Sequence, residues 1–135
     1  MALERIGRSR KNRLGMDVDG TAQRWLITAS TALHPVSAAA RRFSASLSVT
    51  EVTILAAADE LQAATWDAKR WMAANACPDV ELRGRVGLWL KSCAEAALTA
   101  QRAIFDPLAD TEAIIGRLGV LVSIIDIQSQ AFEDW

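Results

Sequence analysis

The residues that could support catalysis are few and scattered along the chain. Among 135 residues there is one histidine, His34, and two cysteines, Cys77 and Cys93. Nucleophilic catalysis by a serine or a cysteine would need His34 as its base, yet His34 stands beside Pro35 with no recognisable serine motif near it. A capping or surface role therefore suits His34 better than a titrating one.

The spacing of the remaining candidates predicts neither a metal site nor a phosphate loop. Helical metal enzymes use a Glu-x-x-His pair, which this sequence does not contain. The two cysteines match no zinc or redox spacing, so we expect free thiols in a reducing cytoplasm. No glycine-rich loop occurs, because Gly84, Gly87, Gly116 and Gly119 lie within helical or apolar patterns. We therefore predict no cofactor, no metal and no enzymatic function.

A basic segment precedes a mildly acidic remainder. The net charge of the chain is −1, whereas residues 1–15 carry five positive charges and one negative, which leaves −5 for the rest. The basic residues are Arg5, Arg8, Arg10, Lys11 and Arg13. Such an arm could bind nucleic acid by displacing counterions from phosphate. We favour a flexible, solubilising tail over residues 1–18, or a leader ahead of Met16, because no aromatic residue occurs before Trp25.

The most apolar stretch lies near the C-terminus and predicts the core helix, at about 107–133. Apolar residues recur there at the helical spacing of three and four, at Leu108, Ile115, Leu118, Val122, Ile125 and Phe132. A second set widens this stripe, at Ile114, Val120, Leu121, Ile124 and Ile127. A helix this apolar should be covered by other helices. Arg117 and Asp126 interrupt the run, which argues against a membrane span, and Gly116 and Gly119 predict close packing by a neighbouring helix.

Three further helical patterns precede this helix. The first covers about 21–46 and should break at Pro35, because proline cannot donate the backbone hydrogen bond of a helix interior. The second covers 49–76 and begins with a capping box from Ser48 to Glu51. The third covers 78–105, with its stripe at Leu82, Val86, Trp89, Cys93, Ala96, Ala97, Ala100 and Ile104. We predict an all-α fold, an antiparallel up-and-down bundle of four main helices in one domain over residues 19–135.

Five tryptophans in so small a chain point to an interaction surface, since tryptophan is enriched in interface hot spots. Trp66 lies at the edge of its helical stripe and could stack on Arg70, one turn away. Trp66, Arg70 and the terminal Trp135 are thus candidate partner contacts. The favoured alternative for Trp66 is partial cover by another helix, and Trp135 either folds back onto the bundle or contacts another chain.

The leading hypothesis is a cytoplasmic interaction module that binds another protein or itself. The alternative is a nucleic-acid-associated regulator that uses the basic arm. A third hypothesis is a pocket for a small apolar ligand lined by Trp71, Trp89 and Val122, although these residues suit a plain core equally well.

Overall fold

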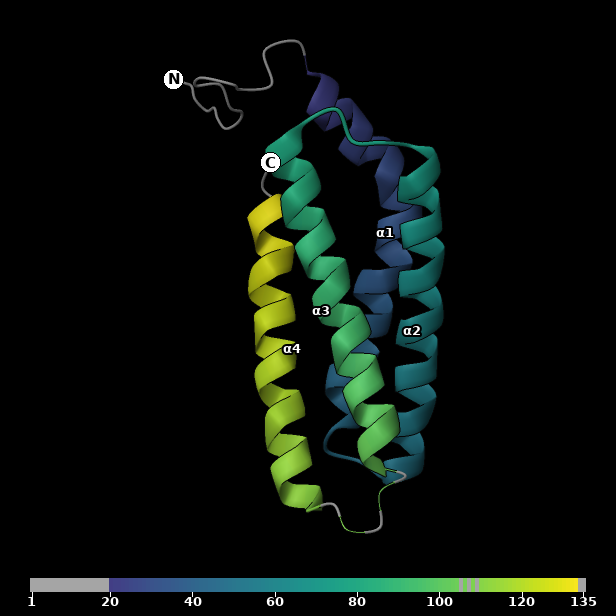
Figure 1. The fold of residues 1–135 in the computed structure, drawn as a ribbon, viewed down its shortest axis with the longest axis vertical. Helices are drawn as coiled ribbons and strands as arrows, with labels where there is room; N and C mark the ends of the chain where they lie inside the picture. The colour runs from purple at the N-terminus through teal and green to yellow at the C-terminus, as the bar shows by residue number, and fades with distance from the viewer. Residues whose placement is uncertain (1–19, 105, 107, 109, 134–135) are drawn as a thin grey trace.

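Four antiparallel helices form an up-and-down bundle (Figure 1). The computed structural model describes residues 20–104, 106, 108 and 110–133. The helices are α1 (Thr21–Ser46), α2 (Glu51–Ala74), α3 (Val80–Ile104) and α4 (Thr111–Glu133). Helices that follow one another in sequence pack along their length, whereas α1 and α4 touch much less. The prediction of an all-α bundle of four main helices is confirmed.

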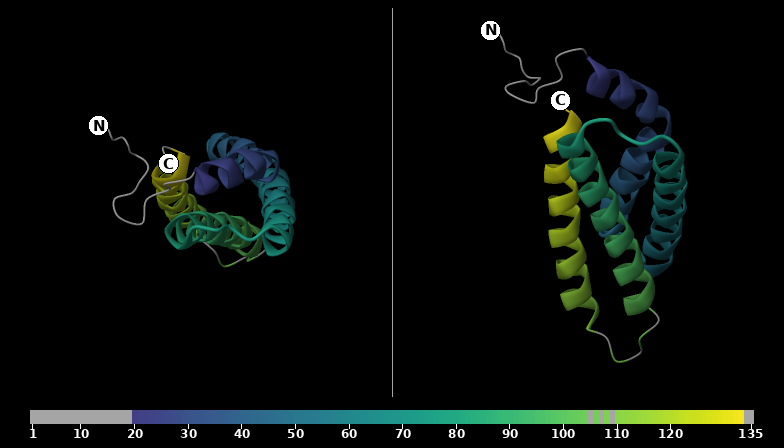
Figure 2. Two further views of the ribbon diagram at one scale, coloured as in Figure 1. Left: turned by 90° about the horizontal axis from the view of Figure 1, so that it is seen from above. Right: turned by 45° about the horizontal axis from the view of Figure 1, so that its top comes forward.

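The first helix runs through Pro35, so the predicted break at this residue is wrong. A proline inside a helix costs about 3 kcal/mol or more. Burying a large apolar side chain contributes roughly 1.5–3 kcal/mol, and α1 buries such residues on both sides of the proline, at Trp25, Leu33, Val36 and Phe43. Their combined burial outweighs the proline cost, and the N-terminal part of α1 leans over the end of the bundle instead of separating (Figure 2).

The second helix begins at Glu51 with Thr50 as its N-cap, so the predicted capping box at Ser48 is wrong. The Thr50 hydroxyl accepts a hydrogen bond from the Thr53 backbone N–H at 3.3 Å. Ser48 instead donates to the Ala45 carbonyl at 3.3 Å. Because α1 extends to Ser46, Ser48 still belongs to the turn that closes α1 and is not available to open α2.

An aspartate directly precedes the first residue of both α3 and α4. The Asp79 carboxylate accepts a hydrogen bond from the Leu82 N–H at 2.9 Å, and α3 begins at Val80 instead of 78. The Asp110 carboxylate accepts from the N–H groups of Glu112 and Ala113 at 3.1 and 3.3 Å, so α4 begins four residues later than predicted. Carboxylates satisfy the free N–H groups and the positive end of the dipole at a helix start.

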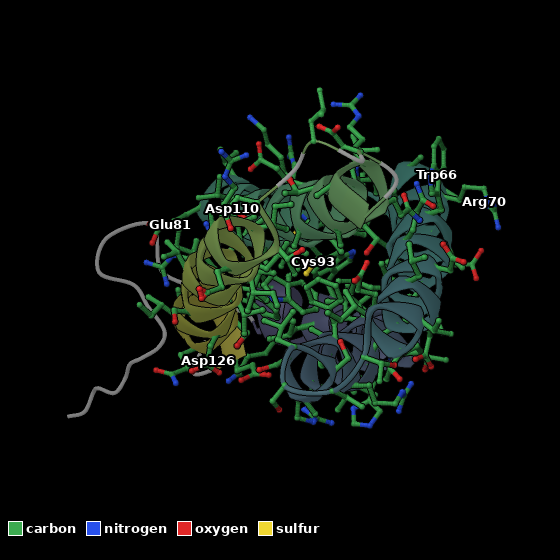
Figure 3. The ribbon with its side chains drawn as sticks, turned by 90° about the horizontal axis from the view of Figure 1, so that it is seen from below. Trp66, Arg70, Glu81, Cys93, Asp110 and Asp126 are labelled. Carbon is green, nitrogen blue, oxygen red and sulfur yellow. The ribbon has the colours of Figure 1, made fainter. Side chains whose placement is uncertain are left out.

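The core lies between the helices and follows the predicted stripe of α3, whereas Leu108, predicted on the stripe of the last helix, precedes α4 and is 93% exposed. The third helix buries the predicted residues Leu82, Val86, Trp89, Cys93, Ala96, Ala97 and Ala100, while the side chain of Ile104 lies outside the described residues. The rings of Trp25 and Trp71 lie 5.7 Å apart, and the Trp25 indole donates to the Asn75 carbonyl at 2.8 Å. Cys93 occupies the centre of the bundle (Figure 3), where burial raises the pKa of its thiol to about 12.

Candidate functional site

The fourth helix is apolar on two opposite faces. Leu118, Ile125 and Phe132 are buried on its inner face. Exposed apolar residues follow one another at the same helical spacing on the other face, at Ala113, Gly116, Val120, Ile124, Ile127 and Ala131. We call these six residues the outer stripe. Ile127 is 67% exposed, and the prediction that other helices of the chain cover Val120, Ile124 and Ile127 is wrong.

The third helix extends the outer stripe at one end. The Arg85 guanidinium donates to the Ala131 carbonyl at 2.6 Å, which fixes the register between α3 and α4. Leu88 lies about one turn after Arg85 on α3, and Ile127 lies about one turn before Ala131 on α4. Because the two helices are antiparallel, these steps run in the same direction, so Leu88 and Ile127 lie at about the same level. Leu88 is also exposed. The apolar surface therefore crosses from α4 onto α3.

No neighbouring helix of the described bundle packs against Gly116 or Gly119 of α4. A Cβ placed on Gly116 or Gly119 would meet no described atom within 4 Å. The predicted close packing at these glycines is therefore wrong within the described bundle. Gly116 belongs to the outer stripe, so its backbone is accessible to anything that docks there.

The predicted partner contacts lie away from the outer stripe. Trp66 is 59% exposed on α2, on the opposite side of the bundle from α4 (Figure 3). Arg70 forms an ion pair with Asp67, and the predicted stacking of Arg70 on Trp66 is not formed. The prediction of Trp135 as a contact falls outside the described residues, as do the basic residues of the arm, Arg5, Arg8, Arg10, Lys11 and Arg13.

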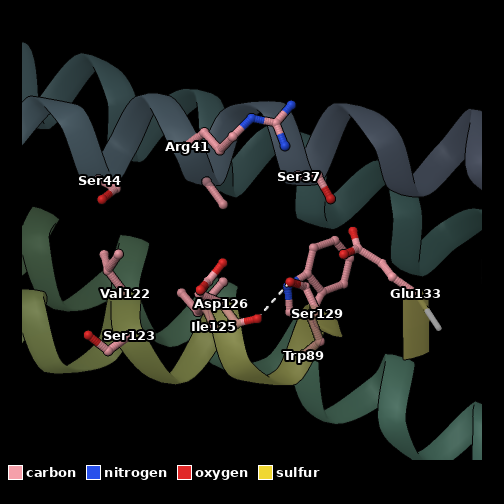
Figure 4. Close-up of a pocket in the computed structure, with 11 residues that line it drawn as sticks. Ser37, Arg41, Ser44, Trp89, Val122, Ser123, Ile125, Asp126, Ser129 and Glu133 are labelled. Carbon is pink, nitrogen blue, oxygen red and sulfur yellow. Dashed lines mark hydrogen bonds between the residues drawn. The ribbon is translucent and has the colours of Figure 1, made fainter. Parts of the chain in front are cut away.

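A groove of about 340 Å³ lies between α1 and α4 (Figure 4). Its floor includes Trp89 from α3 with Val122 and Ile125 from α4. Small hydroxyl side chains line both walls, Ser37 and Ser44 from α1 and Ser123 and Ser129 from α4. Trp89 and Val122 thus line a groove, as one hypothesis proposed, whereas the ring of Trp71 packs at a tilt against Trp25 elsewhere in the bundle.

The indole of Trp89 leaves one hydrogen-bonding group unpaired beside this groove. Trp89 is 1% exposed, and its Nε1–H has no partner among the described residues. A buried donor without an acceptor costs about 1–3 kcal/mol. Phe132 packs edge-on against the indole with ring centroids 5.0 Å apart, and the nearby Ser129 hydroxyl donates to the Asp126 carbonyl at 2.8 Å. The fold therefore holds the indole firmly at the groove without satisfying its N–H.

Charged side chains of both signs flank the groove. Arg41 lies on the α1 wall, and Asp126 and Glu133 lie on the α4 wall (Figure 4). A smaller cavity of about 180 Å³ shares Ser37 and Glu133 with the groove and includes His34, which is exposed. Sequence reasoning did not single out Ser37, Ser44, Ser129 and Glu133, because isolated serines and acids on a helix look like ordinary solvated positions.

Comparison with known proteins gives this chain no relatives, since no family model, no curated protein and no solved structure matches it. Within the described residues, every helix falls short of the length and hydropathy that crossing a membrane requires. The same residues contain no group of three or more histidines, cysteines or acids placed to bind a metal.

Proposed function

We propose that this protein is an interaction module that assembles through the outer stripe of α4. The observation that carries the proposal is the two-sided apolarity of this helix. A helix that is apolar all round belongs in an interior, and large exposed apolar surfaces mark sites of association. The inner face of α4 is covered by the bundle, while Val120, Ile124 and Ile127 remain exposed.

A second copy of this chain is the occupant that suits the outer stripe best. Two stripes running antiparallel about a twofold axis near residue 122 would place Val120 opposite Ile124 and Gly116 opposite Ile127. Alanines would meet at both ends, so large residues would face small or branched ones. The stripe covers about 27 Å at a rise of 1.5 Å per residue. A self-complementary patch of this kind is what a twofold dimer requires.

The test is the association state of the full chain, measured by sedimentation across the micromolar range. A matched pair of variants is available, because Ile127 on α4 and Ile27 on α1 are 67% and 72% exposed. We expect the wild type to dimerise, Ile127→Glu to weaken the dimer by at least about tenfold, which corresponds to about 1.4 kcal/mol, and Ile27→Glu to behave as the wild type. Equal effects of the two variants would contradict the assignment of the stripe.

A wild-type chain that stays monomeric would rule out the second copy as the occupant. Affinity capture of the tagged protein from its own cells, with and without nuclease, then separates the remaining functions. If a stoichiometric partner protein is still recovered after nuclease treatment but is lost with Ile127→Glu, the proposed function as an interaction module is supported. Recovery that collapses with nuclease, and with removal of residues 1–15, would favour the nucleic-acid-associated regulator.

A further inference from the structure

We propose that the groove between α1 and α4 binds a small organic amine that also carries a hydrogen-bond acceptor. This proposal does not depend on the outer stripe, which lies on a different face of α4. It rests on three features of the groove, namely an unpaired buried donor, an apolar floor and an excess of carboxylates on the walls.

The unpaired donor determines the first requirement of the ligand. The Trp89 indole can donate one hydrogen bond and cannot accept one. Its Nε1–H lies next to Ser129 (Figure 4), has almost no accessible surface of its own and has no partner among the described residues. A carbonyl or hydroxyl oxygen of a ligand would satisfy the indole once the side chains that cover this nitrogen move aside. The ligand therefore needs an acceptor oxygen at this point.

The floor and the volume determine the second requirement. Val122 and Ile125 present aliphatic surface beside the indole. The groove volume of about 340 Å³ lies near the lower end of the range for small-molecule sites. A compact aliphatic body can thus lie on this floor while its acceptor oxygen reaches Trp89.

The charges on the walls determine the third requirement. Two carboxylates, from Asp126 and Glu133, face one guanidinium, from Arg41, so the lining favours a cation over an anion. Ser129 lies three residues after Asp126 and four before Glu133, so the backbone positions of both acids are about one helical turn, or about 5 Å, from Ser129 along α4. An ammonium group separated from the acceptor oxygen by a few bonds can pair with either carboxylate.

The test follows the indole N–H signal of Trp89 by NMR in the full chain with ¹⁵N-labelled tryptophan, assigned with Trp89→Phe. Three probes share an isobutyl group: leucine amide has an ammonium and an acceptor, 3-methylbutylamine lacks the acceptor, and N-acetylleucine is an anion with an acceptor. We expect leucine amide to shift the Trp89 signal saturably. We expect the other two probes to bind at least about tenfold more weakly, the effect of one lost polar contact of about 1.4 kcal/mol.

Two charge variants complete the test without altering the floor. Combined Asp126→Asn and Glu133→Gln should weaken leucine amide several-fold, while Glu112→Gln, an exposed acid of α4 that does not line the groove, should change nothing. Absence of a saturable Trp89 shift would overturn the proposal. So would binding of either comparison probe as tight as that of leucine amide.

Discussion

The seam between α2 and α3 is closed, whereas the seam between α1 and α4 is open. At the first seam Ala58 and Ala97 are fully buried, and the Gln101 amide of α3 donates to Asp59 and Gln62 of α2 at 2.7 and 3.0 Å. At the second seam serines line both walls of a groove. Alanine and serine are close in size, so volume alone does not separate the two seams.

Hydration explains the difference between the seams better than volume does. Burying a hydroxyl without a partner costs free energy, and burying a methyl group gains it. Ser123 and Ser129 bond to carbonyls of their own helix, at 3.1 and 2.8 Å, whereas the hydroxyls of Ser37 and Ser44 make no hydrogen bond within the described residues. A seam of this composition is more stable when it stays accessible to water or to a ligand.

The largest expected effect is a loss of stability at the closed side of the bundle. Leu61→Ala should lower the free energy of unfolding by about 2–5 kcal/mol, because Leu61 is fully buried and the surrounding helices cannot collapse onto the cavity. Val122→Ala at the floor of the open groove should cost less than about 1.5 kcal/mol. Urea titration of both variants measures the contrast, and equal losses would show that the two sides are packed alike.

Alkaline titration tests the centre of the bundle, which both seams enclose. Burial raises the pKa of the Cys93 thiol from 9.0 to about 12, so between these values the unfolded chain ionises and the folded chain does not. Stability is thus retained below pH 9 and falls as the pH rises toward 12, by at most about 1.4 kcal/mol per pH unit. Cys93→Ala should remove this component, measured as the difference between the urea midpoints of the two proteins across that range.

Two glycine substitutions test whether a partner covers the outer stripe, because Gly116 belongs to the stripe and Gly87 does not. Gly87→Ala on α3 and Gly116→Ala on α4 should each stabilise the monomer by about 0.5–1 kcal/mol, because both glycines are helical and a Cβ would meet no described atom within 4 Å. Sedimentation then distinguishes them. Gly116→Ala should weaken the proposed dimer, whereas Gly87→Ala should leave it unchanged; an unchanged dimer in both would place the contact away from Gly116.

The smallest effect is expected at the exposed ion pair that links α1 to α2. The Arg42 Nε donates to Glu60 at 2.8 Å, and this hydrogen bond lowers the pKa of the Glu60 carboxyl. The pair is exposed, so Glu60→Gln should barely move the thermal midpoint at neutral pH. The stabilisation is present above the ordinary carboxyl pKa and is lost as the pH falls through the lowered value. The small difference between variant and wild type should therefore vanish in acid.

Local sequence patterns predicted the number of helices and their inner faces. The stripe from Leu82 to Ala100 is buried as predicted, because a fixed helical period allows one set of side chains to face inward. The same reasoning failed at Pro35, where packing along the whole helix outweighed the local cost of the proline, and at Ser48, which belongs to the turn that closes α1. It also failed at Ile127, since an apolar residue on a periodic stripe does not reveal whether a neighbour exists to cover it.

The sequence by itself determined the all-α class, the helical face of α3 and the burial of Cys93, because each follows from a period of 3.6 residues and the gain from removing apolar surface from water. The tertiary structure decided which face of α4 remains exposed and that Trp89 meets serines instead of a hydrogen-bond acceptor at the α1–α4 groove. These outcomes depend on which helices become neighbours, and helices distant in sequence become neighbours only when the whole bundle closes.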